Sequence, residues 1–308
     1  MIWKTAFTLG RVSNLPTVWT NVLAAAIISR KTASLSFSLT DWPLLLVACF
    51  SISLLYIGGM YLNDAYDRNI DAVEKPSRPI PSGKVSAKTV FIVGYLLLIS
   101  GMFGLSLTAF FHGSVLVGPL FALLLGAAIV FYDMRHKKNR FGPVVMGLCR
   151  ALVYASVAFA LTKVTLFHQP GLWLAPLALW CYIIGLSYIA RQENLSKVKN
   201  LWPLLFLFTP LCFALYFLLF MDIHIFRAIN VYSVVSLMVA LAAVVVYSFL
   251  KLRKPEKVGI SQAVSVMIAG ICLLDALVLA LYGQSYAVAV GAAGFLLTLL
   301  FQHFIPGT

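Results

Sequence analysis

Residues 61–83 read YLNDAYDRNIDAVEKPSRPIPSG, a stretch that holds four of the chain's ten acidic residues directly after a strongly apolar run. In a helix, Asn63, Asp67 and Asp71 follow one another at intervals of four, and each interval turns the helix face by only about 40°. Asp64 would lie about 20° from Asp71 and so borders the same stripe. The stretch therefore predicts one helix face that carries four oxygen-bearing side chains at the end of an apolar helix.

Basic residues follow this stripe closely. Arg68 stands four residues after Asp64, so we expect a local ion pair between them. Three prolines then exclude a helix and Gly83 closes a loop, whose basic residues are Lys75, Arg78 and Lys84. Mg²⁺ prefers carboxylates together with substrate phosphate oxygens, and arginine supplies paired donors to phosphate. The stretch predicts a site for Mg²⁺ and a diphosphate, with the alternative that it is a polar loop whose acids only offset its bases.

The order NDAYDRNID followed by KPSRPIPSG resembles the first aspartate-rich motif and the following loop of the UbiA-type intramembrane prenyltransferases. The resemblance implies an all-α bundle of membrane helices that transfers a prenyl group from a prenyl diphosphate. It also implies which residues form the Mg²⁺ and diphosphate site: Asn63, Asp64, Asp67 and Asp71 as metal ligands, with Arg78 in the basic surroundings of the diphosphate.

The composition independently indicates a membrane protein. Of the residues, 61% are hydrophobic and only 11% are charged, with a mean hydropathy of +0.95, whereas soluble domains carry about 25% charged residues. Apolar runs of about 20 residues, the length that crosses a bilayer, number ten. They cover residues 12–29, 43–65, 88–111, 113–133, 142–162, 171–190, 201–221, 229–250, 259–282 and 285–305. Because the family core has nine helices, we expect a polytopic bundle of nine to ten transmembrane helices in a single domain, residues 1–308.

The net charge of +13 is distributed unevenly along the chain. Most lysines and arginines fall in four alternate loops, residues 66–88, 134–141, 191–200 and 251–258, and the intervening loops hold only Arg30, Lys31, Lys163 and Arg227. The positive-inside rule therefore places the N-terminus and the aspartate-rich loop in the cytoplasm. We expect a multi-pass protein of the inner or plasma membrane with its active site on the cytoplasmic face and no nucleic-acid partner.

Other polar residues extend the resemblance. In the family, an arginine or asparagine of the first helix faces the polar cavity, which implies diphosphate-site roles for Arg11 and Asn21. The alternative is an arginine that reaches the membrane surface and an asparagine that bonds a neighbouring helix. The loop between the fourth and fifth helices is also similar to that of the family and implies diphosphate contacts for Tyr132 and Lys137.

Arg150 and Asp275 are charged residues within apolar segments. Arg150 lies about two turns inside the fifth segment, roughly 10 Å along a helix, where an unpaired charge costs at least about 2.5–3.5 kcal/mol. We expect it to meet an anion, either from the protein or from a bound diphosphate. Asp275 lies deep in the ninth segment, where it must be protonated or bonded across helices, and we do not assign it to the site.

The sixth segment departs from the family, whose members commonly carry a second aspartate-rich motif here. Only Glu193 is present, next to Arg191, a pattern that resembles the EboC-like bacterial branch. Three interpretations stay open: Glu193 alone holds a second Mg²⁺, Arg191 replaces that metal as the positive charge, or the ionisation step is impaired. In the alternative interpretation, these residues only cap the end of the helix and have no role in the site.

The sequence therefore predicts an all-α integral membrane prenyltransferase whose substrates are a prenyl diphosphate and an acceptor of unspecified type. Its cofactor is Mg²⁺, and its catalytic residues are the metal ligands Asp67, Asp71 and Glu193. A second hypothesis is a carrier or flippase that binds a phosphorylated lipid or metabolite without breaking a bond. The five cysteines lie in apolar segments without paired spacing and indicate neither a disulfide framework nor a metal cluster.

Overall fold

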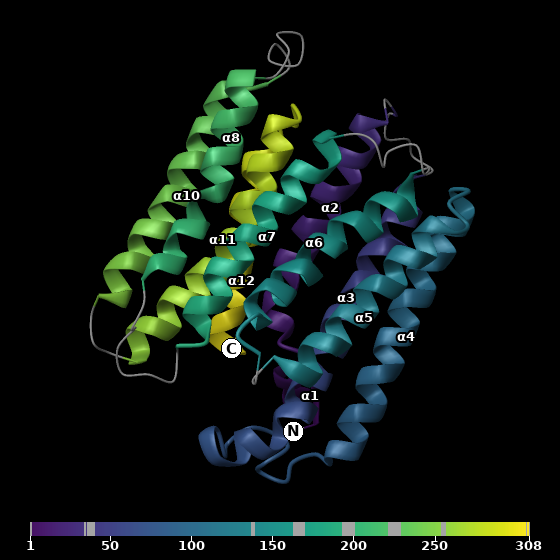
Figure 1. Cartoon of the computed structure of the whole chain (residues 1–308), viewed down its shortest axis with the longest axis vertical. Coiled ribbons are helices and arrows are strands. Elements are labelled where there is room, and N and C mark those ends of the chain that lie inside the picture. The colour runs from purple at the N-terminus through teal and green to yellow at the C-terminus, as the bar shows by residue number, and fades with distance from the viewer. Residues whose placement is uncertain are drawn as a thin grey trace.

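The computed structural model describes residues 2–33, 35, 41–136, 139–162, 170–192, 201–220, 229–253, 257–305 and 307, and every regular element within these ranges is a helix. A short helix, α1 (Ile2–Leu9), and a 3-10 turn, η1 (Val12–Asn14), precede the bundle. The bundle consists of α2 (Leu15–Thr32), α3 (Asp41–Glu74), α4 (Ala87–Phe111), α5 (Val117–Arg135), α6 (Gly142–Leu161), α7 (Pro170–Ala190), η3 (Trp202–Phe208), α8 (Thr209–Phe220), α10 (Val231–Leu252), α11 (Lys257–Leu281) and α12 (Ala287–Phe304) (Figure 1).

Ten helical segments in the described ranges are long and apolar enough to cross a membrane, and η3 with α8 forms one of them. Each overlaps one of the ten apolar runs in the sequence. The breaks that separate α4 from α5 and α11 from α12 contain Gly113 and Gly283, whose φ angles of 75° and 77° are left-handed. Such a glycine ends a helix without strain. The break between α11 and α12 therefore separates two helices. The described part of the chain has ten candidate membrane spans.

Two helices form the centre of the bundle. In the apolar stretch of each span, 78% of the residues of the α2 span and 89% of those of the α11 span are buried, whereas the share is 28% for α4 and 22% for α12. The helix α11 packs on α2, α7, α8, α10 and α12, and α2 also contacts α3 and α6. Figure 1 shows α8 and α10 at one edge of the bundle and α4 at the opposite edge. The outer helices therefore turn apolar side chains to lipid.

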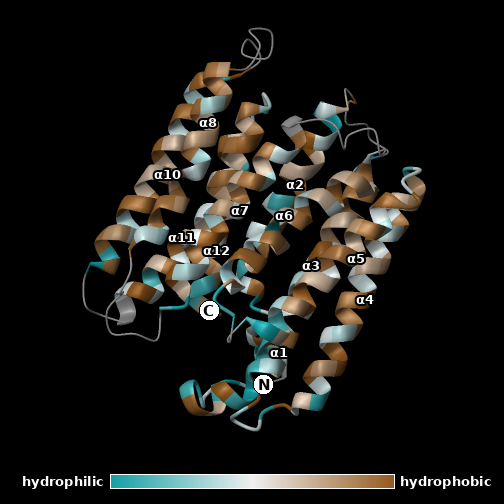
Figure 2. Cartoon of the chain, viewed as in Figure 1, coloured by the Kyte–Doolittle hydropathy of each residue, from teal (hydrophilic) through white to brown (hydrophobic). Residues whose placement is uncertain are grey.

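The helix α3 is longer than a membrane span. Its 34 residues extend about 51 Å at 1.5 Å per residue, whereas the hydrocarbon core is about 30 Å thick. Its last turns carry the aspartate-rich stretch beyond the apolar part of the bundle. Figure 2 shows hydrophilic residues gathered at this end, around α1, the end of α3 and the C-terminus.

Glycines allow α3 to pack closely on α4. A Cβ atom on Gly101 would lie 2.6 Å from the carbonyl oxygen of Ser51, and one on Gly58 would lie 2.8 Å from the carbonyl oxygen of Gly94. In lipid, close backbone packing of this kind replaces the hydrophobic effect as the attraction between helices. The contact fixes the helix that carries the aspartates.

We expect Gly101→Leu to lower the thermal midpoint of the purified protein in detergent, because the added side chain has no space between α3 and α4. Overpacking typically costs about 1–3 kcal/mol. Reaction of the buried thiols of Cys149 and Cys272 with a fluorescent thiol reagent during heating measures the midpoint. The matched control is Ile99→Leu, since Ile99 on α4 is 57% exposed. Equal midpoints for the two variants would contradict the close contact.

Candidate functional site

A cavity of about 560 Å³ lies between α2, α3, α5, α6, α7 and α11. It follows α3 from Ile52 to Glu74, about 33 Å of helix. At the polar end of the bundle its wall includes Asn63, Asp67 and Asp71. The remainder is largely apolar and is lined by residues that include Val18, Ile52, Leu125, Val153, Ile183 and Ile268.

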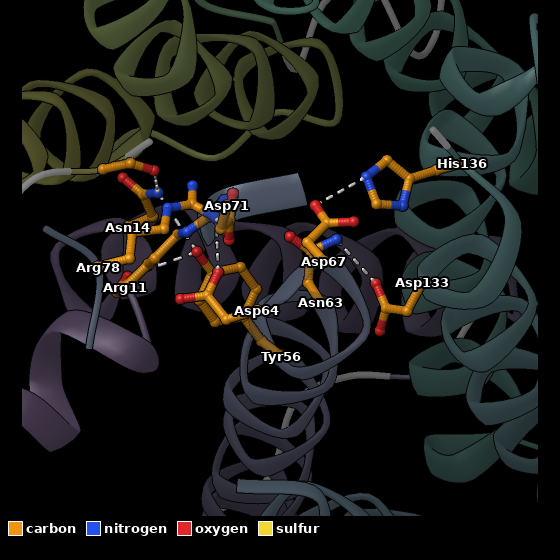
Figure 3. A network of polar contacts seen from close by, with 11 residues as sticks. Arg11, Asn14, Tyr56, Asn63, Asp64, Asp67, Asp71, Arg78, Asp133 and His136 are labelled. Carbon is orange, nitrogen blue, oxygen red and sulfur yellow. Dashed lines mark hydrogen bonds and ion pairs between the residues drawn. The ribbon is translucent and has the colours of Figure 1, made fainter. Parts of the chain in front are cut away.

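The four oxygen-bearing side chains predicted on α3 are all buried, and they form two groups (Figure 3). Asp64 and Asp71 turn toward the arginines, and Asn63 and Asp67 turn toward α5. The helix period explains the division, because Asp64 and Asp71 lie about 100° and 80° around the axis from Asn63, whereas Asp67 lies only about 40° away. The stripe predicted from the sequence is present, and its two edges have different partners.

The first group is an arginine cluster. The Nη1 atom of Arg78 donates to Asp64 Oδ1 at 3.1 Å and to Asp71 Oδ2 at 2.6 Å. Arg11 Nη2 donates to the same Asp64 oxygen at 3.3 Å. The loop after α3 turns back through bonds such as Lys84 N to Pro79 O, 3.0 Å, and this reversal returns Arg78 to the helix. Arg11, Arg78 and Asp71 line the cavity, and Asp64 lies behind them.

Arg11 stands in an unusual backbone conformation. Its φ of 42° and ψ of 46° are left-handed, which is uncommon for a residue other than glycine. The Tyr56 hydroxyl donates to the Arg11 carbonyl at 3.4 Å. Burial alone would lower the pKa of Arg11, but the Asp64 carboxylate together with Tyr56, Tyr132 and Asp67 raises the pKa above its usual value. Arg11 is therefore held as a cation against α3.

The ion pair predicted between Asp64 and Arg68 is wrong. Arg68 donates to the carbonyl oxygen of Ala65 at 3.0 Å, and its guanidinium lies over the ring of Phe91 at 5.7 Å. Its position is a further 40° around the helix from Asp64, on the side away from the cavity. Arg78 reaches Asp64 instead, from fourteen residues away.

The second group joins α3 to the end of α5. Asn63 Nδ2 donates to Asp133 Oδ1 at 3.2 Å, and Nε2 of His136 lies 3.3 Å from Asp67 Oδ2. The ring of Tyr132 stacks on that of His136 at 4.7 Å, and Tyr132 lines the cavity as the resemblance implied.

Neither Asp133 nor His136 is among the site residues predicted from the sequence. A signal was available for Asp133, since it is the one acid in residues 132–141, YDMRHKKNRF, and acids at the end of an apolar helix are costly. Lys137, another predicted contact, lies outside the described residues.

Arg150 lines the same cavity from α6. Its guanidinium donates to Asn21 Oδ1 at 2.9 Å and to Thr17 Oγ1 at 3.2 Å, and it lies over the ring of Tyr56 at 5.6 Å. Tyr56 precedes Asp67 by eleven residues on α3, about 16 Å of helix, and Tyr56 also donates to the Arg11 carbonyl. The contact of Arg150 with a diphosphate stays a prediction.

Asn21 connects Arg150 to Asp275. The Asn21 amide donates to both oxygens of Asp275, at 2.8 and 2.6 Å. Thr20 and Tyr154 donate to the same carboxylate at 2.7 and 2.6 Å, so Asp275 is bonded across helices. Asn21 is fully buried and is not among the residues that line the cavity. The protein therefore provides the anion expected for Arg150. This anion is Asp275, and the Asn21 amide connects it to the arginine.

Arg191 marks the end of α7. It lines the cavity and donates to the carbonyl oxygen of His136 at 2.8 Å. Its side chain therefore lies beside the group formed by α3 and α5. Glu193, the predicted ligand of a second metal, lies outside the described residues.

The residues present fit a Mg²⁺ ion that arrives with phosphate. Among the described residues, no three histidine, cysteine or acidic side chains are arranged to enclose a metal ion. Mg²⁺, however, is usually held by one or two carboxylates plus substrate phosphates. Asp67 and Asp71 offer such carboxylates on the cavity wall, and a buried oxygen of Asp133 has no hydrogen-bond partner in the described part of the chain.

We expect Arg78→Gln to lower the thermal midpoint more than Arg68→Gln does. The first change leaves Asp64 and Asp71 buried without their shared cation, and breaking a buried pair costs up to about 3–5 kcal/mol. The second removes one backbone hydrogen bond and one aromatic contact, about 1 kcal/mol each. Thermal midpoints of both purified variants measure the difference. A larger loss in Arg68→Gln would contradict the arginine cluster.

Comparison with known proteins gives consistent matches. The model of the UbiA prenyltransferase family matches residues 18–257. Curated relatives named digeranylgeranylglyceryl phosphate synthase include those of Metallosphaera sedula (32% identical over 147 residues, 46% of this chain and 47% of the relative) and Methanothrix thermoacetophila (32% over 158 residues, 50% and 52%). A third, from Korarchaeum cryptofilum, is 41% identical over 120 residues, 37% of this chain and 40% of the relative. The chain spans about half the length of the curated relatives it matches.

Two solved structures share the fold. One comes from work on digeranylgeranylglyceryl phosphate synthase in membranes, with a TM-score of 0.58 and 20% identity over 91% of this chain and 98% of that chain. The other is the apo structure of a UbiA homolog from Aeropyrum pernix K1, with a TM-score of 0.51 and 13% identity over 94% and 96%.

Proposed function

The chain belongs to the UbiA prenyltransferase family, and we propose that it transfers a prenyl group from a prenyl diphosphate to an acceptor within the membrane, with Mg²⁺ as cofactor. The observation that carries this proposal is the cavity that follows α3. Its apolar length suits an isoprenoid chain, and its carboxylates and arginines suit a diphosphate with its metal. The curated relatives are named for a product that carries prenyl groups and a phosphate.

In this proposal, the metal ligands are Asn63, Asp67 and Asp71, with Glu193 from the end of the sixth segment. Mg²⁺ supplies positive charge that stabilises the departing diphosphate. Asp64, which lies behind the cavity wall, contributes by holding Arg11 and Arg78 in place. The donors to the phosphate oxygens are Arg11, Arg78, Tyr132, Lys137 and Arg191.

The transfer breaks the bond between the first prenyl carbon and the diphosphate oxygen, and the electron pair leaves with the diphosphate. The acceptor attacks the allylic cation that remains and loses a proton. Apolar side chains such as Ile52, Leu125 and Ile183 line the cavity and keep water from the cation. No covalent enzyme intermediate is needed.

We assign Arg150 to the acceptor, because its guanidinium lies over Tyr56, which precedes Asp67 on α3 by about 16 Å of helix. Asn21 and Thr17 fix its guanidinium, and the remaining donors can meet an oxygen of the acceptor. Such an oxygen belongs to a phosphate, a carboxylate or a quinone carbonyl. Asn21 then acts as a positioning residue between Arg150 and Asp275.

The second hypothesis, a carrier or flippase, would use the same cavity without breaking a bond. Membranes that contain the protein, incubated with labelled prenyl diphosphates of several chain lengths, distinguish the two by lipid mass spectrometry. The proposed transferase yields a new prenylated lipid and inorganic diphosphate. Transport of the intact diphosphate without any release supports the carrier.

We expect Asp67→Asn and Asp71→Asn to abolish turnover, because each change keeps the side-chain size and removes the charge that binds Mg²⁺. Asp64→Asn should have a smaller effect, since Asp64 acts through the arginines. Initial rates at subsaturating Mg²⁺ measure these losses. The control is Asp41→Asn, whose carboxylate pairs with Arg30 at 2.8 Å near the start of α3. Wild-type rates in both Asp67→Asn and Asp71→Asn would make the carboxylates structural.

We also propose that the polar end of the cavity faces the cytoplasm. In a background without the five cysteines, we expect Lys75→Cys to react with a membrane-impermeant thiol reagent only from the cytoplasmic side. We expect Lys31→Cys, near the end of α2, to react only from the other side, because basic loops stay inside. Labelling of both positions from one face would contradict this topology.

A further inference from the structure

The segment that follows α12 reaches the cavity beside the arginine cluster. Gly307 is buried and lines the cavity together with Arg11 and Asn14. The helix α12 packs on α2 and η1, and Gln302 in its last turn contacts Asn14. Arg11, Asn14 and α12 all lie outside residues 18–257, which the family model matches. The diphosphate contacts of the proposed function do not explain this junction between the two ends of the described chain.

The side chain of Asn14 is the centre of the junction. Asn14 is 4% exposed, and its Nδ2 atom donates to the carbonyl oxygen of Gly307 at 3.0 Å and to the Tyr56 hydroxyl at 3.3 Å. Its Oδ1 atom accepts from Gln302 Nε2 at 2.9 Å. A carbonyl oxygen can only accept a hydrogen bond, so the contact with Gly307 fixes which way the amide points. Gln302 and Gly307 therefore hold both ends of the Asn14 amide.

The contact leaves no space for a side chain at residue 307. A Cβ atom on Gly307 would lie 2.9 Å from Asn14 Oδ1 and 3.1 Å from Gln302 Nε2. Glycine permits such a close approach of the backbone to a bonded pair of polar side chains. The fit indicates a specific contact between the segment after α12 and Asn14.

Asn14 in turn holds the backbone of Arg11. Among the described residues, Arg11 is the one non-glycine residue with a positive φ, and such a conformation costs about 1–3 kcal/mol and persists only where the surroundings enforce it. The Arg11 carbonyl accepts from the Asn14 backbone nitrogen at 3.0 Å and from the Tyr56 hydroxyl at 3.4 Å. Because that hydroxyl also accepts from Asn14 Nδ2, Asn14 acts on the Arg11 carbonyl both directly and through Tyr56 (Figure 3).

We propose that Gln302 and Gly307 are positioning residues for the diphosphate site. They hold Asn14, and Asn14 holds Arg11 in the left-handed conformation from which its guanidinium reaches the cavity and Asp64. The inference rests on the proposed function in one respect, since it takes Arg11 as a donor to phosphate oxygens. It adds that the segment after α12 sets the affinity of the site for the diphosphate without touching it.

The test is a double-mutant cycle on diphosphate affinity. The full-length protein in detergent is titrated with inorganic diphosphate in the presence of Mg²⁺ by isothermal calorimetry. We expect Gln302→Leu, which removes one hydrogen bond that holds Asn14, to weaken binding about three- to tenfold. In an Arg11→Gln background the same change should have no further effect, because residues that act through one another are not additive. A purely structural role of Gln302 would not depend on Arg11.

The matched control is Gln284→Leu. Gln284 also makes one side-chain hydrogen bond, to the carbonyl oxygen of Tyr282 at 3.3 Å, but it precedes the other end of α12, and we expect unchanged affinity. If Gln302→Leu does not fold, Gly307→Ala displaces the Asn14 amide from the other side and is interpreted in the same way.

The outcomes separate this inference from the proposed function. Unchanged affinity in a folded Gln302→Leu, or an equal loss with and without Arg11, overturns the inference even if the wild-type protein transfers prenyl groups. The expected cycle in a protein that turns over no prenyl diphosphate overturns the proposed function and leaves the positioning role intact. A wild-type protein that does not bind inorganic diphosphate contradicts both.

Discussion

A charge near the apolar part of a membrane protein needs a partner, and this constraint decides where each acid of α3 points. The helix places the four oxygen-bearing side chains Asn63, Asp64, Asp67 and Asp71 over about 100° of its surface. Those at one edge, Asp64 and Asp71, meet Arg78 and Arg11. Those at the other edge, Asn63 and Asp67, meet side chains from the end of α5. One stretch of helix therefore has one edge paired with arginines and another edge bonded to the end of α5.

The rest of the fold keeps this arrangement in place. The extra length of α3 brings its polar turns to the end of the bundle, and glycine contacts with α4 fix the helix in position. The proline-rich loop turns back and returns Arg78 to α3. Farther along the cavity, the chain of hydrogen bonds from Arg150 through Asn21 to Asp275 balances a second charge. The remainder of the cavity wall is largely apolar.

Local features of the sequence predicted much of this structure. The ten spans follow from the length of apolar runs, and the closeness of Asp64 to Asp71 follows from the helix period. The prediction of an ion pair between Asp64 and Arg68 was wrong because helix spacing relates only residues that are close in the sequence. The loop after α3 folds back and brings Arg78 to Asp64 instead. The contacts of Asp133 and Asn21 depend on how α3 packs against α5 and α2 against α11, which no local pattern contains. The roles of Lys137 and Glu193 stay predictions.

The central claim is that the acids of α3 hold a metal that activates a diphosphate. The most direct measurement is the release of inorganic diphosphate from a prenyl diphosphate by the purified protein in lipid vesicles, with and without Mg²⁺. The account predicts release that requires Mg²⁺ and appears together with a prenylated acceptor. Release of the same rate after all divalent metal has been chelated would contradict it.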